Sequence, residues 1–276
     1  AADAAIEAVE RKRNGKSAES PVIVVDNTLG AFLKDHIKQN NLSEGDPVTL
    51  SFKDMLKTYL RRSREVTIKD PTDPKSPVER RYLSDNQIGE EAVKRFKETE
   101  KIIDELNFNG PASPIDWVRY RLGKAGISVA EITGRDHTIE YSGEGKGVLG
   151  RKSEKEAGTA GKVNTVEGFN EGRIEVMIIN RSGATGLSAH ASKDFGNQNR
   201  RHMIILQAAK NIDEFIQIMG RIHRTGQVVA PKFTLLMTDA PAEKRPASVL
   251  VKKLAKLNAS VTGKSKGILD FDVPDI

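Results

Sequence analysis

Residues 174–207 read IEVMIINRSGATGLSAHASKDFGNQNRRHMIILQ, and this stretch decides the fold class. It holds two continuous apolar runs, at 174–179 and 202–207, which are typical of strands buried on both faces of a parallel sheet. The next expected elements are a helix, a strand and a helix, over about 212–224, 232–237 and 247–258. Because strands and helices alternate, we predict an α/β domain whose parallel sheet is covered by helices on both sides.

The same alternation is present upstream. A short amphipathic helix opens the chain, and Pro21 introduces the apolar run VIVVD, which predicts another buried strand. Ser113 is a good N-cap and Pro114 a good first residue for a helix that ends at Gly126. The run ISVAEIT at 127–133 follows as a further strand.

Two segments interrupt this order and are interpreted as insertions, at about 41–110 and 136–162. The first contains the proline-rich run DPTDPKSP at 70–77, which forbids regular structure and predicts a flexible tip. The second is rich in Gly, Lys and Glu and is predicted to be mobile. We therefore expect one domain over 1–276 with two insertions.

The composition narrows the class of protein. The 276 residues are 37% hydrophobic but only 5% aromatic, and 44 Lys plus Arg against 38 Asp plus Glu give a net charge of +6. This mild basic excess fits a nucleic-acid partner only weakly. The absence of cysteine excludes disulfides and thiolate metal sites. No apolar run reaches the roughly 20 residues that span a bilayer, so we expect a soluble, intracellular protein without a membrane partner.

The strongest chemical signal is QIMGRIHR at 217–224. On a helix, Gln217, Arg221 and Arg224 share one stripe, and Gly220 allows another backbone or a ligand to approach closely. Two guanidinium groups on one face suit an anion with several oxygens, because each binds phosphate through two parallel hydrogen bonds. The pattern predicts a phosphate site.

The loop after the strand at 174–179 is the second signal. Gly183, Thr185 and Gly186 expose backbone N–H groups and a hydroxyl without steric bulk, which suits phosphates of a nucleotide or a nucleic acid. Such a loop is weak by itself, but it lies about 30 residues before the arginine pair.

These stretches resemble motifs V and VI of superfamily-2 helicases. The resemblance implies that Arg221 and Arg224 are arginine fingers. It also implies that Gln217, Gly220 and His223 take part in ATP binding and in coupling the nucleotide cleft to the nucleic acid. VIVVDNT resembles motif IV, and ITGR resembles the end of a neighbouring strand in the same lobe. The nucleic-acid contacts implied in this way are Asn27, Thr28, Gly134, Arg135, Ser182 and Ser188.

A closer resemblance is to the strawberry notch-like helicases. It rests on GATGLSAHAS, on QNRRH at 198–202 and on GRIHRTGQ at 220–227, where Gly226 replaces the Asn usual in that family. The resemblance implies a C-terminal, RecA-like motor lobe that works on DNA or RNA. It also implies that ATP and Mg²⁺ are held mainly by an N-terminal RecA-like lobe, and that this chain alone is inactive.

Two look-alike motifs are interpreted as structural. NASVTGKS at 258–265 nearly matches a phosphate-binding loop, but it lacks the first glycine and follows a helix. Asp104 and Glu105 lie in an amphipathic run rather than at a strand end. Four of the histidines, namely His137, His190, His202 and His223, lack metal-ligand spacing.

Two alternatives remain open on the sequence. One is a non-catalytic nucleic-acid-binding or protein-docking module derived from a helicase lobe. The other is a free-standing nucleotide-binding enzyme, against which the missing phosphate-loop lysine counts. The compartment expected is cytoplasmic in a bacterium or phage-infected cell, and nuclear in a eukaryote.

Overall fold

A computed structural model describes residues 1–68, 79–107, 110–143, 146–153, 156, 158–180, 186–207, 211–238 and 241–262. Its centre is a five-stranded, fully parallel sheet in the order β10-β9-β1-β8-β5. The strands are β1 (Glu19–Val24), β5 (Val129–Ile132), β8 (Val176–Ile179), β9 (Arg200–Ile205) and β10 (Lys232–Leu235). The predicted parallel α/β architecture is confirmed.

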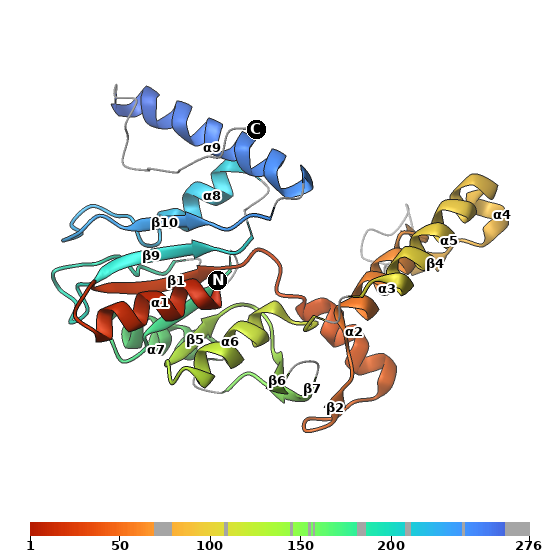
Figure 1. Cartoon of the computed structure of the whole chain (residues 1–276), viewed down its shortest axis with the longest axis horizontal. Helices are drawn as coiled ribbons and strands as arrows, with labels where there is room; N and C mark the ends of the chain where they lie inside the picture. Colours follow the sequence, from red (N-terminus) through yellow and green to blue (C-terminus); the bar gives the residue numbers. More distant parts are fainter. Residues whose placement is uncertain are drawn as a thin grey trace.

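The sheet is buried on both faces, which explains the continuous apolar runs. Along β1, Val22 and Val24 face one core and Ile23 faces the other. The first core is closed by α7 (Gly158–Asn170), α8 (Ile212–Met219) and α9 (Pro241–Thr262). The second is closed by α1 (Ala2–Arg13) and α6 (Pro114–Lys124), which lie together in Figure 1.

The two predicted insertions form one substructure. A second, antiparallel sheet joins β2 (Pro47–Val48) from the first to β6 (His137–Gly143) and β7 (Lys146–Arg151) from the second, with Val48 opposite Gly147. A third core beneath it includes Leu50, Met55, Ile139 and Leu149, together with side chains of α2 (Gly30–Asn40). The prediction that the second segment is mobile is therefore wrong for 137–143 and 146–151. Residues 69–78, which include the proline-rich run, lie outside the described residues.

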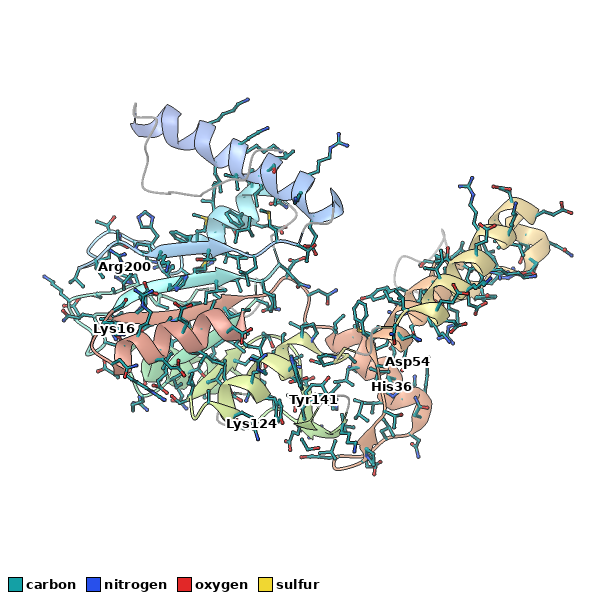
Figure 2. All side chains as sticks on the ribbon, in the orientation of Figure 1. Lys16, His36, Asp54, Lys124, Tyr141 and Arg200 are labelled. Atoms are coloured by element: carbon teal, nitrogen blue, oxygen red, sulfur yellow. The ribbon has the colours of Figure 1, made fainter. Side chains whose placement is uncertain are left out.

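An arm extends away from the main sheet (Figure 1). It consists of α3 (Phe52–Arg62), β3 (Glu65–Ile68), β4 (Glu79–Tyr82), α4 (Asp85–Ile88) and α5 (Glu90–Glu105), with α3 packed on α5. His36 of α2 and Asp54 of α3 lie close together at its base (Figure 2). Nearer the tip, the guanidinium of Arg64 lies over the rings of Tyr82 and Phe96, at 4.8 and 4.9 Å from their centroids. The arm thus has a cation–aromatic contact of its own.

No helix in the described part of the chain is long and apolar enough to cross a membrane.

Candidate functional site

The predicted helix over 212–224 is shorter than expected. Asn211 caps α8 by accepting a hydrogen bond from the N–H of Glu214 at 2.9 Å, but the helix ends at Met219. The chain then turns at Gly220, and Ile222 beyond it is fully buried. The single helical stripe predicted for Gln217, Arg221 and Arg224 is therefore wrong, because both arginines lie in the turn after the helix.

A segment of the β8–β9 connection anchors this turn. We call residues 187–192 the strap. The N–H of Ala189 donates to the carbonyl of Arg221 at 2.9 Å, and the N–H of Val228 donates to the carbonyl of Ala191 at 2.8 Å. An antiparallel bridge between Ser192 and Gln227 continues the pairing. The backbone that carries the arginines is thus paired with the strap from Ala189 to Ser192.

Arg224 is also held through its side chain. Its Nε donates to the carbonyl of Gly220 and its Nη2 to the carbonyl of Leu187, both at 3.1 Å. These bonds fix the plane of the guanidinium, while the side chain as a whole stays exposed. Arg221 is half-buried and makes no ion pair with any described residue. With respect to the described residues, both guanidinium groups therefore keep N–H donors for a ligand.

Several basic side chains gather here, and we call Lys162, His190, Arg221 and Arg224 the cation cluster, in which the imidazole of His190 is the neutral member because its pKa is lowered. Burial lowers the pKa of Arg221, and the charge of Arg224 lowers it further. Burial followed by the charge of Arg221 does the same to Lys162 of α7. His190 has a lowered pKa through burial, Arg224 and Arg201. Mutual repulsion of this kind is relieved by a bound anion.

Sequence reasoning missed Lys162, because it fell within a segment interpreted as a mobile insertion. For His190 the sequence showed only that metal-ligand spacing is lacking. Only the fold brings α7 beside the turn after α8, so no local signal identifies either residue. His223 is half-buried beside the arginines, and Gln217 is exposed on α8.

The glycine-rich loop is only partly placed. Residues 181–185, and with them Ser182, Gly183 and Thr185, lie outside the described residues. Gly186 has φ of 77°, a left-handed conformation that favours glycine. Ser188 belongs to the strap, and its hydroxyl bonds to Nδ1 of His190 at 2.9 Å. The described end of the loop therefore leads directly into the cation cluster.

The motif IV residues shape the turn after β1. The side-chain oxygen of Asn27 accepts a hydrogen bond from the N–H of Leu29 at 2.9 Å. The backbone N–H of Asn27 donates to the side-chain oxygen of Gln207 at 2.9 Å. The hydroxyl of Thr28 accepts from the N–H of Gly30 at 3.4 Å. Asn27 is exposed and Thr28 half-buried. Both lie at the carboxyl edge of the sheet, where ligands of open α/β sheets bind.

Arg135 does not fit the nucleic-acid contact predicted for it. Only 4% of the residue is exposed, and its guanidinium bonds to Asp116 and to Glu131, each at 2.6 Å. Burial alone would raise the pKa of Glu131, but hydrogen bonds from Arg135 and Thr133 lower it to about 2. The prediction is wrong because the guanidinium of Arg135 is buried and already bonded to two carboxylates. Gly134 beside it is exposed, and its role stays a prediction.

Other arginines that attract attention in the sequence are engaged as well. Arg62 pairs with Asp35 and Arg64 with Asp85, each at 2.5 Å, and Arg121 pairs with Asp3 at 2.5 Å. Carboxylates therefore already compensate these three arginines of the arm and of α6.

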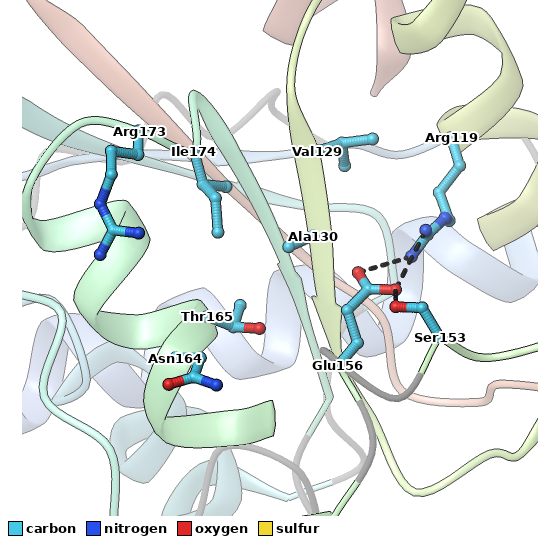
Figure 3. A pocket seen from close by; sticks show the side chains of 9 residues that line it. All are labelled: Arg119, Val129, Ala130, Ser153, Glu156, Asn164, Thr165, Arg173 and Ile174. Atoms are coloured by element: carbon cyan, nitrogen blue, oxygen red, sulfur yellow. Dashed lines mark hydrogen bonds and ion pairs between the residues drawn. The ribbon is translucent and has the colours of Figure 1, made fainter. Parts of the chain in front are cut away.

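A cavity of about 570 Å³ lies at the β5 edge of the sheet, between β5 and α7 (Figure 3). Arg119 and Glu156 form an ion pair at 3.1 Å on its wall. Glu156 also accepts a hydrogen bond from the N–H of Glu131 at 2.9 Å, so it covers part of an open strand edge. None of the residues that line the cavity belongs to the cation cluster.

The look-alike motifs are structural where they are described. Asp104 pairs with Lys57 at 2.5 Å, and residues 258–262 are the last turn of α9 rather than a loop after a strand. Among the described residues no three His, Asp or Glu side chains are grouped to hold a metal ion.

Known proteins resemble this chain over most of its length. Residues 113–271 match the helicase C-terminal family described as "C-terminal domain on Strawberry notch homologue". Over 71% of this chain, the sequence is 34% identical to Protein FORGETTER 1 of Arabidopsis thaliana. Over 63% of this chain, it is 30% identical to Protein strawberry notch of Drosophila melanogaster. These matches span 15% and 10% of the two relatives.

Among solved structures, the C-terminal part of the Fun30 ATPase domain overlaps 49% of this chain and 35% of that one, at 17% identity and a TM-score of 0.35, which is too low to argue from. The family match covers more than half of the chain and includes the strap, the turn after α8 and α9. The resemblance drawn from the motifs is therefore confirmed, and this chain belongs to the strawberry notch family as a helicase C-terminal domain.

Proposed function

We propose that this chain is one motor lobe of an ATP-dependent helicase or translocase, and that its cation cluster meets the γ-phosphate of ATP held by an N-terminal RecA-like lobe. The observation that carries the proposal is the cluster itself. The charge of Arg224 lowers the pKa of Arg221, and no described carboxylate pairs with either arginine. A site built in this way favours a polyanion.

The side chains present fit a phosphate group. The carbonyls of Gly220 and Leu187 orient the Arg224 guanidinium, and its Nη1 bonds to no described residue. Bound ATP supplies the phosphoanhydride bond and the negative charge that builds on its γ-phosphoryl oxygens. Arg221 and Arg224 would stabilise that charge, with Gln217 and His223 at the rim of the site. The described residues offer no carboxylate cluster for Mg²⁺, so we assign no step to it.

The nucleic-acid side of the proposal rests on the sheet edge. Asn27 and Thr28 follow β1, Gly134 follows β5, and Ser188 lies beyond β8. Since β1 and β5 are parallel strands of one sheet, Asn27, Thr28 and Gly134 lie at the same carboxyl edge. We infer that DNA or RNA backbone contacts this edge. Ser188 lies nearer the amino ends of the strands, where Asn170 at the end of α7 donates to its carbonyl, and its hydroxyl bonds to His190 of the cluster.

The test is ATP hydrolysis by the full-length protein that carries this chain, with single- and double-stranded DNA and RNA as stimulants. We expect Arg221→Ala and Arg224→Ala each to lower kcat by about 10³-fold or more, as loss of an arginine finger does. ATP binding, measured by equilibrium dialysis, should remain, because the other lobe holds most of the nucleotide.

Arg11→Ala is the matched control. Arg11 is an arginine of α1, on the opposite side of the sheet, where it makes only an exposed pair with Glu7. Wild-type turnover in both cluster variants would sink the arginine-finger assignment. A wild-type protein that binds nucleic acid but hydrolyses no ATP with any of the four stimulants would favour a docking module instead.

A further inference from the structure

Arg201, at the start of β9, is fully buried although no described carboxylate pairs with it. Its charge is met by backbone carbonyls. Nε donates to Ala189 at 2.8 Å, Nη1 to Asn199 at 3.1 Å, and Nη2 to Asn197 at 2.9 Å and to His190 at 3.4 Å. The guanidinium also lies 4.9 Å from the centroid of the Phe169 ring. One side chain thus gathers four carbonyls.

This arrangement is costly unless the bonds are made. Burial lowers the pKa of Arg201 to about 10, so the group is still charged at neutral pH. A buried charge needs hydrogen-bond partners, and here four of the five guanidinium N–H groups meet backbone carbonyls of the β8–β9 connection. The connection must therefore adopt this one path for Arg201 to be buried. Conversely, a buried Arg201 fixes the path.

The fixed path reaches the cation cluster directly. Ala189 accepts from Arg201 through its carbonyl and donates to the carbonyl of Arg221 through its N–H at 2.9 Å. Two residues earlier, the carbonyl of Leu187 receives the Arg224 guanidinium. Asn170 of α7 adds a second brace, because its Nδ2 donates to the carbonyl of Ser188 at 3.2 Å.

We propose that Arg201 is a positioning residue: it locks the strap so that Arg221 and Arg224 are presented to the phosphate in one geometry. This inference rests on the proposed function for its effect on turnover, but its structural half is independent. Arg201 has no route to the ligand itself, since it is fully buried. Its influence passes through Ala189 and Leu187.

The experiment compares Arg201→Lys with Arg135→Lys in the full-length protein. Both substitutions replace a buried guanidinium by an ammonium group and so remove the same set of N–H donors. The guanidinium of Arg135, however, bonds to carboxylates beside β5, at the other end of the sheet. Hydrogen exchange followed by mass spectrometry reports on each segment separately. We expect Arg201→Lys to speed exchange in peptides from 186–192 by roughly tenfold or more, with strands β1 and β8 unchanged.

Turnover supplies the second readout. A small displacement of catalytic groups costs up to about 10²-fold in rate, so we expect kcat to fall by that order while KM for ATP changes little. Arg135→Lys should speed exchange around 113–135 and leave kcat per folded molecule within about twofold of wild type.

If Arg201→Lys does not fold, Asn170→Ala removes only the brace on Ser188 and should give a smaller change of the same kind. Unchanged exchange in 186–192 in the variant that folds would overturn the proposal. Faster exchange with unchanged kcat would also overturn it, because the strap would then be loose without consequence. Failure of Arg221→Ala to affect turnover concerns the arginine fingers alone, and leaves the exchange result to judge Arg201.

Discussion

Two groups of charged side chains lie in different parts of this fold and differ in how their arginines are compensated. Beside β5, Arg135 is enclosed by Asp116 and Glu131, and Arg119 by Glu131 and Glu156. We call these five residues the paired cluster. In the cation cluster, by contrast, Arg221 and Arg224 have no carboxylate among the described residues.

The pKa shifts run in opposite directions. Burial would lower the pKa of Arg135, but hydrogen bonds to Glu131 and Asp116 raise it. Burial lowers the pKa of Arg221, and Arg224 lowers it again. The paired cluster is therefore complete without a ligand, whereas the cation cluster gains from one. Arginines of equal appearance in the sequence have opposite roles, and the presence of carboxylates separates them.

The largest effect on stability is expected at the paired cluster. Arg135→Met leaves the buried carboxylate of Asp116 without an ion-pair partner among the described residues and leaves Glu131 with Arg119 alone, so the free energy of unfolding should fall by about 3–5 kcal/mol. Denaturant titration of the 276-residue chain measures it. Arg221→Met, in the cation cluster, should lower the free energy of unfolding by no more than about 0.5 kcal/mol, or should raise it. Equal losses in the two variants would break the distinction between the clusters.

A smaller effect is expected from acid. The pKa of Glu131 is lowered from 4.5 to about 2, so its stabilising contribution is present above pH 4.5 and disappears as the pH falls toward 2. The corresponding loss is on the order of 3 kcal/mol. Glu131→Gln should flatten the pH dependence of the unfolding free energy within this window.

Glu91→Gln serves as the control for that measurement, because Glu91 makes only an exposed pair with Arg95 on the arm. It should leave the pH dependence unchanged. A wild-type chain equally stable at pH 4.5 and pH 2.5 would show that the ion pair does not hold Glu131 ionised.

The smallest effect concerns the cation cluster and its histidine. His190 has a pKa lowered by burial and by two arginines, so pyrophosphate bound at the cluster should raise it. NMR titration of the imidazole with and without pyrophosphate measures this, and we expect the pKa to rise when the anion is bound. His202, which contacts Glu19 and Thr234 at 2.9 Å each, should not respond. A rise at both histidines, or at neither, would mean that the anion does not bind selectively at the cluster.

Most of the main sheet was predictable because its strands are buried on both faces and therefore read as apolar runs. VIVVD and HMIIL are unambiguous for this reason, and the structure pairs them directly, with Val22 opposite Met203. The second sheet was not predictable, because β2 has only two residues and its partner β7 lies about 100 positions downstream. Short strands leave no local periodicity.

The site was predictable in its chemistry but less so in its geometry. The spacing of Arg221 and Arg224 indicated an anion site, but α8 ends at Met219, and the strap that bonds to the following backbone lies about 30 residues upstream, where no local pattern reveals the contact. Arg135 was misassigned for a related reason. Its partner Asp116 comes from another element, so the sequence shows a loop arginine where the fold has a buried ion pair.

The shared third core has a consequence for how this lobe can be shortened. Val48 and Leu50 come from one interrupting segment and Ile139 and Leu149 from the other, and each pair covers the other. Deleting either segment alone would expose an apolar surface that the remaining one cannot cover, and so would invite aggregation. A minimal version of the lobe must lose both together, which makes two stretches far apart in the gene a single module in practice.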